Sequence, residues 1–439
     1  MTALNRRALV GGLAASTLAL SVRAGTVTDT DVIIIGAGYA GISAARQLKA
    51  LGIRAVILEA RDRVGGRAFT DTQSLGRKFD KGPYWLHNKA TNPVVPLAKA
   101  AGIELTESAY SNMAAFEDGA VLQAMTPAKF LAVGEAWERK ISSPFARLKD
   151  RSLGSTAPGT DLGQKYLRNI FAVEMGDDPD LVSLQGYYNL EAGEDLVPAT
   201  GMGGLITSLS GGLDIRLNCP VSRIAWKEAH GVTAEGPFGR LTARKIIITV
   251  PTGVLASGAI RFDPALPSAK QTALANLPMG ALEKVAMVLP APMPDLPEYT
   301  LSNSHIQQGH YHALVSAPDK AMMTALIPGP VSRALHGEGA AALEAFALDV
   351  LKNVIGTQAR VQAVSSTNWQ GDPLALGSYP HQTVGHANAR RVYSQPIEDR
   401  LFFAGDGGDD PLAVTVGGAW RQGQKAAQSV AGQLGVKQR

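Results

Sequence analysis

Gly36, Gly38 and Gly41 have the spacing GxGxxG, and the acidic residue Glu59 follows the last of them by 18 positions. Glycines at this spacing allow a tight turn and let the backbone approach a pyrophosphate, which the N-terminus of the following helix attracts. A carboxylate at this distance accepts hydrogen bonds from a ribose and repels a 2′-phosphate. These four residues therefore predict a site for a dinucleotide other than NADP.

Arg61, Gly66 and Arg67 follow directly, in the run EARDRVGGR at 59–67. The glycine pair of this run allows a second close approach of the backbone to a ligand. The guanidinium of Arg67 is well suited to reach a phosphate. The run extends the predicted nucleotide site beyond the acid that binds the ribose.

Three elements must hold these residues in place. The β-branched run at 32–35 is typical of a buried strand, residues 42–51 favour a helix that ends at Gly52, and 54–58 predict the next strand. Such a strand–loop–helix–strand unit brings the glycines and the acid around one ligand. The segment indicates an α/β fold with a Rossmann-like nucleotide-binding domain.

The run at 59–67 resembles the FAD-binding motif of the flavin-containing amine oxidases, a family that includes monoamine and polyamine oxidases and lysine-specific histone demethylases. The resemblance is weak at 105–200 and 290–365, which form most of the substrate side. Elsewhere it recurs in the family's order and spacing, in segments at 80–87, 218–226, 245–251, 277–285, 369–379, 401–406 and 415–419.

The resemblance implies that FAD contacts residues spread over the whole chain. Asp406 stands where many members have Glu and would hold the ribityl chain. Cys219 lies on the adenine side and Ser378 comes before Tyr379, so no cysteine is placed to bond the flavin, and FAD is expected to be non-covalent. Besides the glycine loop and Glu59, the implied cofactor contacts are Arg61, Gly66, Arg67, Gly82, Trp85, Val221, Trp369, Gly405, Asp406, Thr415, Val416 and Ala419.

Lys284 falls on the family's active-site lysine, which the resemblance places near the flavin, with a water between them. Its neighbours at 285–287 are apolar, so we expect a strand that enters a core, where burial lowers the pKa of the lysine. Trp369 is expected beside the flavin and Tyr379 beside the substrate, where aromatic faces hold an amine dry and oriented. The other expected pocket residues are Thr415, His87 and His381.

The activity that the resemblance implies is oxidation of an amine, in which a hydride passes from the α-carbon to flavin N5 and the imine is then hydrolysed. Dioxygen or a periplasmic electron carrier would reoxidise the flavin, and no metal site is expected. Acidic residues of the substrate half are a further feature that could attract a cation or polyamine, or could form only solvated loops. They are Glu174, Asp177, Asp178, Glu191, Glu194 and Asp195.

Two other functions stay open on the sequence. The same fold could carry an L-amino-acid oxidase or a desaturase, and Lys284 argues against a polyene desaturase. An amino-acid oxidase needs a buried arginine for the carboxylate, for which Arg333, Arg390 and Arg391 are candidates. A non-catalytic flavin-binding redox partner would bind FAD without oxidising any amine.

The matching segments interleave two domains along the chain. Residues 26–90, 206–258 and 396–436 are expected to form the FAD-binding domain. Residues 91–205 and 259–395 are expected to form a mixed α+β substrate-binding domain.

Residues 1–24 have the pattern of an export signal. Arg6 and Arg7 resemble a twin-arginine motif, the run at 8–22 is apolar, and Ala24 ends a small-residue cleavage site. About 15 apolar residues are fewer than the ~20 that span a bilayer. We therefore expect a periplasmic protein without an integral membrane segment in the mature chain.

The charge balance bears on partners. Of 439 residues, 42 are Lys or Arg and 38 are Asp or Glu, and removing residues 1–24 leaves 39 basic and 38 acidic. A chain without basic excess has little with which to hold a phosphate backbone, so a nucleic-acid partner is not expected. Many relatives dimerise, so a homodimer is a further expectation.

Overall fold

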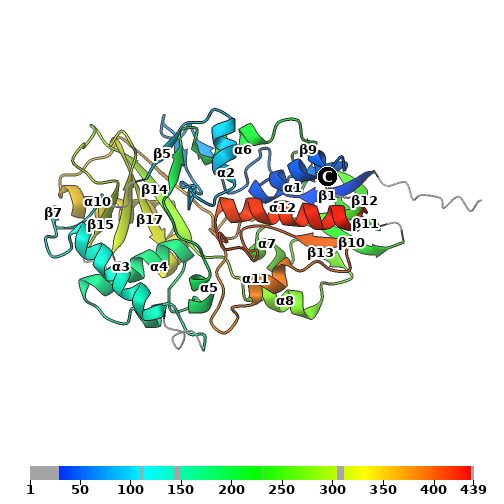
Figure 1. Ribbon diagram of the computed structural model, residues 1–439. Coiled ribbons are helices and arrows are strands. Elements are labelled where there is room, and N and C mark those ends of the chain that lie inside the picture. The colour runs from blue at the N-terminus through cyan, green and yellow to red at the C-terminus, as the bar shows by residue number, and fades with distance from the viewer. Residues whose placement is uncertain (1–28, 109–111, 143–148, 230, 304–310, 437–439) are drawn as a thin grey trace, which may run out of the picture.

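The computed structural model describes residues 29–108, 112–142, 149–229, 231–303 and 311–436. The residues at 1–24, which carry the expected export signal, lie outside these ranges. Figure 1 shows two lobes side by side, each built on one large β-sheet. No helix in the described ranges has the length and apolar character needed to cross a bilayer.

The first sheet has eight strands in the order β13-β10-β11-β12-β1-β2-β9, with β19 beside β12. β1 lies parallel between β12 and β2, so its side chains are covered on both faces, which explains its unbroken β-branched run. The strands are β1 (Thr30–Ile35), β2 (Ala55–Leu58), β9 (Ile215–Arg216), β10 (Arg223–Glu228), β11 (Gly231–Gly236), β12 (Gly239–Ile248), β13 (Arg261–Asp263) and β19 (Leu401–Phe403).

Helices cover both faces of this sheet (Figure 1). One face packs on α1 (Tyr39–Ala50), α2 (Val94–Ala100), α6 (Gly201–Leu209) and α12 (Val416–Gln433). α1 and α12 approach so closely that a Cβ added at Gly423 would lie 2.1 Å from the carbonyl oxygen of Ala40. The opposite face is covered by residues of α7 (Thr252–Ala256), α8 (Ser268–Ala275) and α11 (Ala389–Ser394).

The α/β fold with a Rossmann-like unit and a second mixed lobe is confirmed, and two details differ from the sequence interpretation. β12 begins at Gly239 rather than at 245, because it first pairs antiparallel with β11 before it reaches β1. β13, α8 and α11 come from residues 259–395, which were expected in the substrate domain, yet they pack on the first sheet. A hairpin with the neighbouring strand β11 decides the first point, and partners distant in sequence decide the second.

The second lobe is built on a seven-stranded sheet in the order β18-β14-β17-β16-β15-β6-β7. α9 (Gly329–Glu338) and α10 (Ala340–Ile355) cover one face, and residues of α3 (Pro127–Ile141) and α4 (Leu162–Met175) cover the other. The strands are β6 (Met113–Glu117), β7 (Ala120–Val121), β14 (Leu282–Val288), β15 (Tyr299–Ser302), β16 (His312–Ser316), β17 (Met322–Pro328) and β18 (Ala363–Ser366).

Short elements link the lobes. Two small antiparallel pairs join β3 (Thr70–Asp71) to β4 (Phe79–Asp80) and β5 (Leu105–Glu107) to β8 (Leu196–Pro198). α5 (Leu184–Tyr188) follows α4. The segment after β4 accepts hydrogen bonds from two side chains of the second lobe, those of Lys284 and Trp369.

Candidate active site

The glycine loop between β1 and α1 forms a cradle. Gly36 has φ +101°, a left-handed conformation that favours glycine, and a Cβ at Gly41 would lie 1.9 Å from the Gly36 carbonyl oxygen. A Cβ at Gly38 would instead meet the Gly65 carbonyl oxygen at 3.9 Å, and one at Gly66 would meet the Gly38 Cα at 3.9 Å, both ordinary van der Waals distances. The N-terminus of α1 has no side-chain cap at Gly38. This open, uncapped cradle fits the pyrophosphate of a dinucleotide.

Glu59 is 6% exposed and organises the same loop. Its Oε2 accepts from the Ala37 N–H at 2.7 Å and its Oε1 from the Arg61 N–H at 2.8 Å. Arg61 itself pairs with Asp372 through Nη2 and Oδ2 at 2.8 Å. The acid is thus fixed at the end of β2, where the sequence predicted it.

Arg67 and Asp406, both expected at the cofactor, lie against each other. The guanidinium makes a two-pronged pair with the carboxylate, at 2.7 Å from Nη2 and 2.8 Å from Nη1. Nη1 also donates to the carbonyl oxygen of Ser378 at 2.5 Å. Gly405, which comes before the acid, has φ +149°. Arg67 was expected to reach a phosphate, and in this structure it holds Asp406.

Thr415 begins α12 as its N-cap, and its Oγ1 accepts from the Gly418 N–H at 3.2 Å. Val416 and Ala419 are buried in the first turns of this helix. Val221 lies two residues before β10 begins, buried on the first sheet. Thr415, Val416 and Ala419 therefore lie at the start of a helix, as the family resemblance implies, while Val221 precedes the strand on which it was expected.

Lys284 lies on β14 with 6% of its surface exposed. Its Nζ donates to the carbonyl oxygen of Asp80 at 3.2 Å and to that of Gly82. Burial lowers its pKa to about 8, while the carboxylate of Asp80 acts in the opposite direction. The lowered pKa is as the sequence predicted.

Trp369 and Tyr379 come from the segment that follows β18. The Trp369 indole is buried, and its Nε1 donates to the Lys81 carbonyl oxygen at 2.9 Å. Lys284 and Trp369 therefore hold three consecutive carbonyls of the segment at 80–82. At Gly82 a Cβ would lie 1.9 Å from the Arg67 carbonyl oxygen, so only glycine fits there. The hydroxyl of Tyr379 donates to the carbonyl oxygen of Val173.

Two of the expected pocket residues are histidines, and they have different surroundings. His87 has a side chain 42% exposed, and its Nδ1 lies 2.8 Å from Asp195 Oδ2. His381 is 1% exposed, 3.7 Å from Asp177, and burial lowers its pKa to about 4. Its expected place on the pocket wall is wrong, since a side chain this enclosed lines no open space in the structure.

Trp85, which was expected at the cofactor, stacks edge-on to Tyr84 with ring centroids 5.0 Å apart.

Glu174, from the acidic set, lies on α4. Its side chain is exposed to solvent, yet the surrounding protein desolvates it enough to raise its pKa. Solvent therefore reaches this carboxylate, while neighbouring protein groups partly desolvate it. The Tyr187 hydroxyl donates to Glu174, and the charges of Glu174 and Tyr379 interact strongly enough to raise the pKa of the tyrosine further.

Glu283 was not predicted from the sequence as a site residue. It is 1% exposed, accepts from the Thr367 hydroxyl, and accepts from the Gln370 N–H at 3.0 Å. The same Thr367 Oγ1 accepts from the Lys284 N–H at 2.8 Å. A charged residue beside Lys284, inside an apolar strand, was the only sequence signal for this network.

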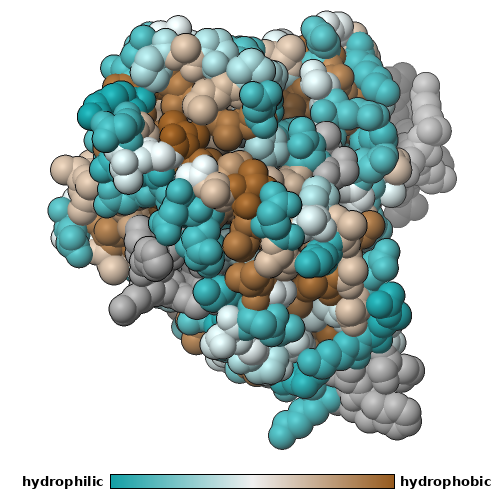
Figure 2. Space-filling view, turned by 90° about the vertical axis from the view of Figure 1, so that its left-hand side faces the viewer, coloured by the Kyte–Doolittle hydropathy of each residue, from teal (hydrophilic) through white to brown (hydrophobic). Residues whose placement is uncertain are grey.

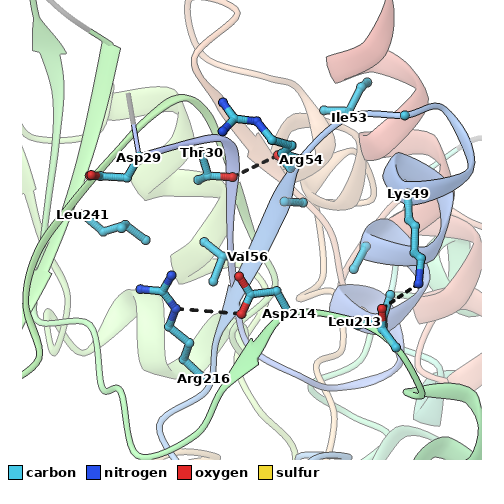
Figure 3. Close-up of a pocket in the computed structure, with 14 residues that line it drawn as sticks. Asp29, Thr30, Lys49, Ile53, Arg54, Val56, Leu213, Asp214, Arg216 and Leu241 are labelled. Carbon is cyan, nitrogen blue, oxygen red and sulfur yellow. Dashed lines mark hydrogen bonds and ion pairs between the residues drawn. The ribbon is translucent and has the colours of Figure 1, made fainter. Parts of the chain in front are cut away.

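A surface pocket of about 530 Å³ lies away from all these residues, at the opposite end of β1 (Figure 3). Its charged groups satisfy one another or the backbone: Lys49 Nζ donates to Gly212 at 2.6 Å and Arg54 pairs with Asp31 at 3.2 Å. It contains none of the expected site residues.

The chain belongs to the family described as flavin containing amine oxidoreductase, whose model matches residues 39–186 and 181–431. Polyamine oxidase 4 of Oryza sativa subsp. japonica is 28% identical over 433 residues, 90% of this chain and 87% of the relative. Lysine-specific histone demethylase 1 homolog 2 of Arabidopsis thaliana is 28% identical over 446 residues, 92% of this chain but only 58% of the relative.

Among solved structures, the fold is similar to that of cyclohexylamine oxidase from Brevibacterium oxydans. The TM-score is 0.78, with 24% identity, over 93% of this chain and 100% of that one. A redesigned putrescine oxidase also has a TM-score of 0.78, with 20% identity, over 92% of this chain and 99% of that one. Family and fold confirm an FAD-dependent amine oxidoreductase.

Proposed function

We propose that the chain oxidises its amine between the segment at 80–82 and Tyr379, with Lys284 and Trp369 as the residues nearest the reacting centre. Lys284 and Trp369, both from the second lobe, donate to consecutive carbonyls of the segment at 80–82, which leads out of the lobe that contains the glycine loop. This observation carries the proposal. FAD, when bound without a covalent link, supplies the two-electron acceptor. The protein then has to orient the amine, exclude water and manage protons.

Each residue has a defined part. Lys284, with a pKa of about 8, holds a proton at Nζ near neutral pH and releases it readily above that. Trp369 is fixed by its indole N–H, so its ring keeps water from one side. Tyr379 is tied at its hydroxyl to Val173, which fixes the ring that the substrate is expected to meet. Thr415 and His87 are proposed to complete the pocket.

We further propose that the substrate carries a second positive group, which Glu174 recognises. A carboxylate that the surrounding protein partly desolvates attracts a cation more strongly than a fully solvated one. Relatives are named polyamine oxidases, and one similar structure is a putrescine oxidase, which supports a diamine or polyamine.

The amino-acid oxidase alternative finds little support. Arg333 is paired at both nitrogens with Asp177, at 2.6 Å from Nη1, and Arg390 is bound to backbone carbonyls. Arg391 is exposed. None of the three offers a free buried guanidinium for a substrate carboxylate.

An anaerobic titration tests the proposal. The purified protein receives a monoamine (cyclohexylamine), a diamine (putrescine), a polyamine (spermidine) or an L-amino acid without oxygen, and the visible spectrum is followed. Bleaching by putrescine and spermidine at lower concentrations than by cyclohexylamine is the expected result. Bleaching by L-amino acids alone, or by none of these compounds, would overturn it.

We also propose periplasmic export directed by residues 1–24, reoxidation by dioxygen or a periplasmic carrier, and a homodimer.

Two exposed hydrophobic residues of the second lobe support the homodimer, since Val121 and Leu131 are 47% and 65% exposed. Figure 2 shows that hydrophobic residues reach the surface in the middle of this end of the molecule, with hydrophilic residues around them. Native mass measurement tests the dimer, and admission of air to the bleached protein separates dioxygen from a carrier.

A further inference from the structure

Arg390, on α11, is an arginine whose three nitrogen groups are all used inside the protein. It is 5% exposed. Its Nε donates to Gln382 Oε1 at 3.1 Å, its Nη2 to the Pro380 carbonyl oxygen at 2.9 Å, and its Nη1 to the Asp406 carbonyl oxygen at 3.2 Å. Burial lowers its pKa to about 10, so it stays charged near neutral pH.

Arg67 makes a matching set of contacts from the nucleotide lobe. It holds the Asp406 carboxylate with two hydrogen bonds and the Ser378 carbonyl oxygen with a third. The two arginines therefore hold the same acid, one by its side chain and one by its main chain. They also hold the carbonyls on either side of Tyr379, those of Ser378 and Pro380.

We propose that Arg390 is a positioning residue that couples the loop of Asp406, on the cofactor side, to the loop of Tyr379, on the substrate side. This inference rests on the proposed roles of Asp406 and Tyr379. When bound FAD fixes the loop of Asp406, Arg390 in turn fixes the loop of Tyr379. A filled cofactor site therefore stabilises the Tyr379 ring on the substrate side.

The geometry favours coupling over a purely local contact. Tyr379 is also tied to a third loop, since its carbonyl accepts from the Gly280 N–H at 2.8 Å and the Ser378 N–H donates to the Gly280 carbonyl at 2.8 Å. Neither of these two bonds involves Asp406, so they fix the Tyr379 ring independently of the cofactor side. Among the hydrogen bonds of the described residues, those of the two arginines join both loops, and a guanidinium spans two carbonyls in a way that an ammonium cannot.

The test compares Arg390→Met and Arg390→Lys with Arg391→Met, a matched change at the exposed neighbouring arginine. Amide hydrogen exchange is measured by mass spectrometry with and without FAD, over peptides that cover 376–384 and 36–41. The FAD dissociation constant is measured by flavin fluorescence on each apoprotein. Neither readout depends on turnover, so both remain valid even if no amine is oxidised and the proposed function fails.

We expect FAD to slow exchange at 376–384 in the wild type and in Arg391→Met. In Arg390→Met that protection falls roughly tenfold and FAD binds about tenfold more weakly, as expected when hydrogen bonds to a buried charge are lost. Protection at 36–41 persists. Arg390→Lys reaches one carbonyl at a time, so its protection at 376–384 and its FAD affinity are intermediate. If Arg390→Met does not fold, the comparison of Arg390→Lys with wild type tests the coupling. Protection at 376–384 that is unchanged in the Arg390 variants would overturn the coupling, even if amine oxidation is confirmed.

Discussion

At the scale of single residues, Lys284 is a lysine that the fold buries with no salt-bridge partner among the residues that the structure describes. Lys284 donates to two backbone carbonyls, so its charge is solvated by dipoles rather than by a carboxylate. Its pKa falls from 10.5 to about 8. A group of this kind can exchange a proton near the pH at which an oxidase works.

This lowered pKa predicts a pH-dependent stability of the apoprotein. Between pH 8 and 10.5 the unfolded chain binds a proton at Lys284 that the folded chain has released, so stability rises with pH in this window. The total gain is roughly 3 kcal/mol. Urea unfolding at several pH values checks this, as the difference between wild type and Lys284→Met. A difference that stays flat from pH 8 to 10.5 would show that the lysine is not buried.

A second prediction at this scale concerns Glu174. Glu174→Gln removes the charge and keeps the shape, so KM for putrescine should rise about tenfold through loss of a charged hydrogen bond, while KM for cyclohexylamine changes little. Glu194→Gln is the matched control, because that acid belongs to the same acidic set and its side chain is 76% exposed. Steady-state kinetics on both amines test this. Equal effects on the two amines would remove Glu174 from substrate recognition.

At the scale of elements, the glycine loop has the least tolerance for change. Gly41→Ala places a methyl group 1.9 Å from the Gly36 carbonyl oxygen, so α1 must move away from β1. We expect the variant to lose bound FAD and several kcal/mol of stability. Gly211→Ala is the control, because its Cβ would meet no atom within 4 Å. The ratio of flavin to protein absorbance gives the answer, and a fully loaded Gly41→Ala protein would contradict the assignment of the cradle.

Elements with local determinants could be predicted from the sequence, and elements with distant partners could not. β1, α1 and β2 begin and end within three residues of the predicted bounds, because the apolar runs and glycines that predict them lie in the segment itself. β13 was missed because it gains its place only by pairing with β10, 38 residues earlier. The site shows a similar division: the positions of Lys284 and Asp406 came from family motifs, while the contacts of Arg390 depend on how the segment at 380–382 and the loop of Asp406 fold around it.

At the scale of the whole molecule, the two lobes share one chain that crosses between them several times (Figure 1). The site lies where side chains of the second lobe, such as Lys284 and Trp369, meet backbone that leaves the first. Neither sheet alone holds a complete set of the proposed residues. The interleaved order of the chain is therefore what brings the cofactor side and the substrate side together.

The proposed export signal at 1–24 precedes β1, which begins at Thr30, so its removal is expected to leave the fold intact. A chain starting at Gly25 should fold, bind FAD and melt at the same temperature as the full chain. If the export proposal is right, mass spectrometry of the periplasmic fraction finds a mature N-terminus just after Ala24. A full-length protein recovered only from the cytoplasm would contradict export. A chain that starts at Ile35 is the control, and it should not fold, because it lacks most of β1 between its two partner strands.

The central claim is that Lys284 acts at the reacting centre. Its most direct test is stopped-flow spectroscopy of Lys284→Met, which follows flavin bleaching by putrescine without oxygen and then the return of colour in air. The account predicts a yellow, folded variant in which at least one of these rates falls about a hundredfold, as for loss of an acid–base group. Lys227→Met, at an exposed lysine paired with Glu398, should leave both rates unchanged. Wild-type rates for both steps in Lys284→Met would contradict the account.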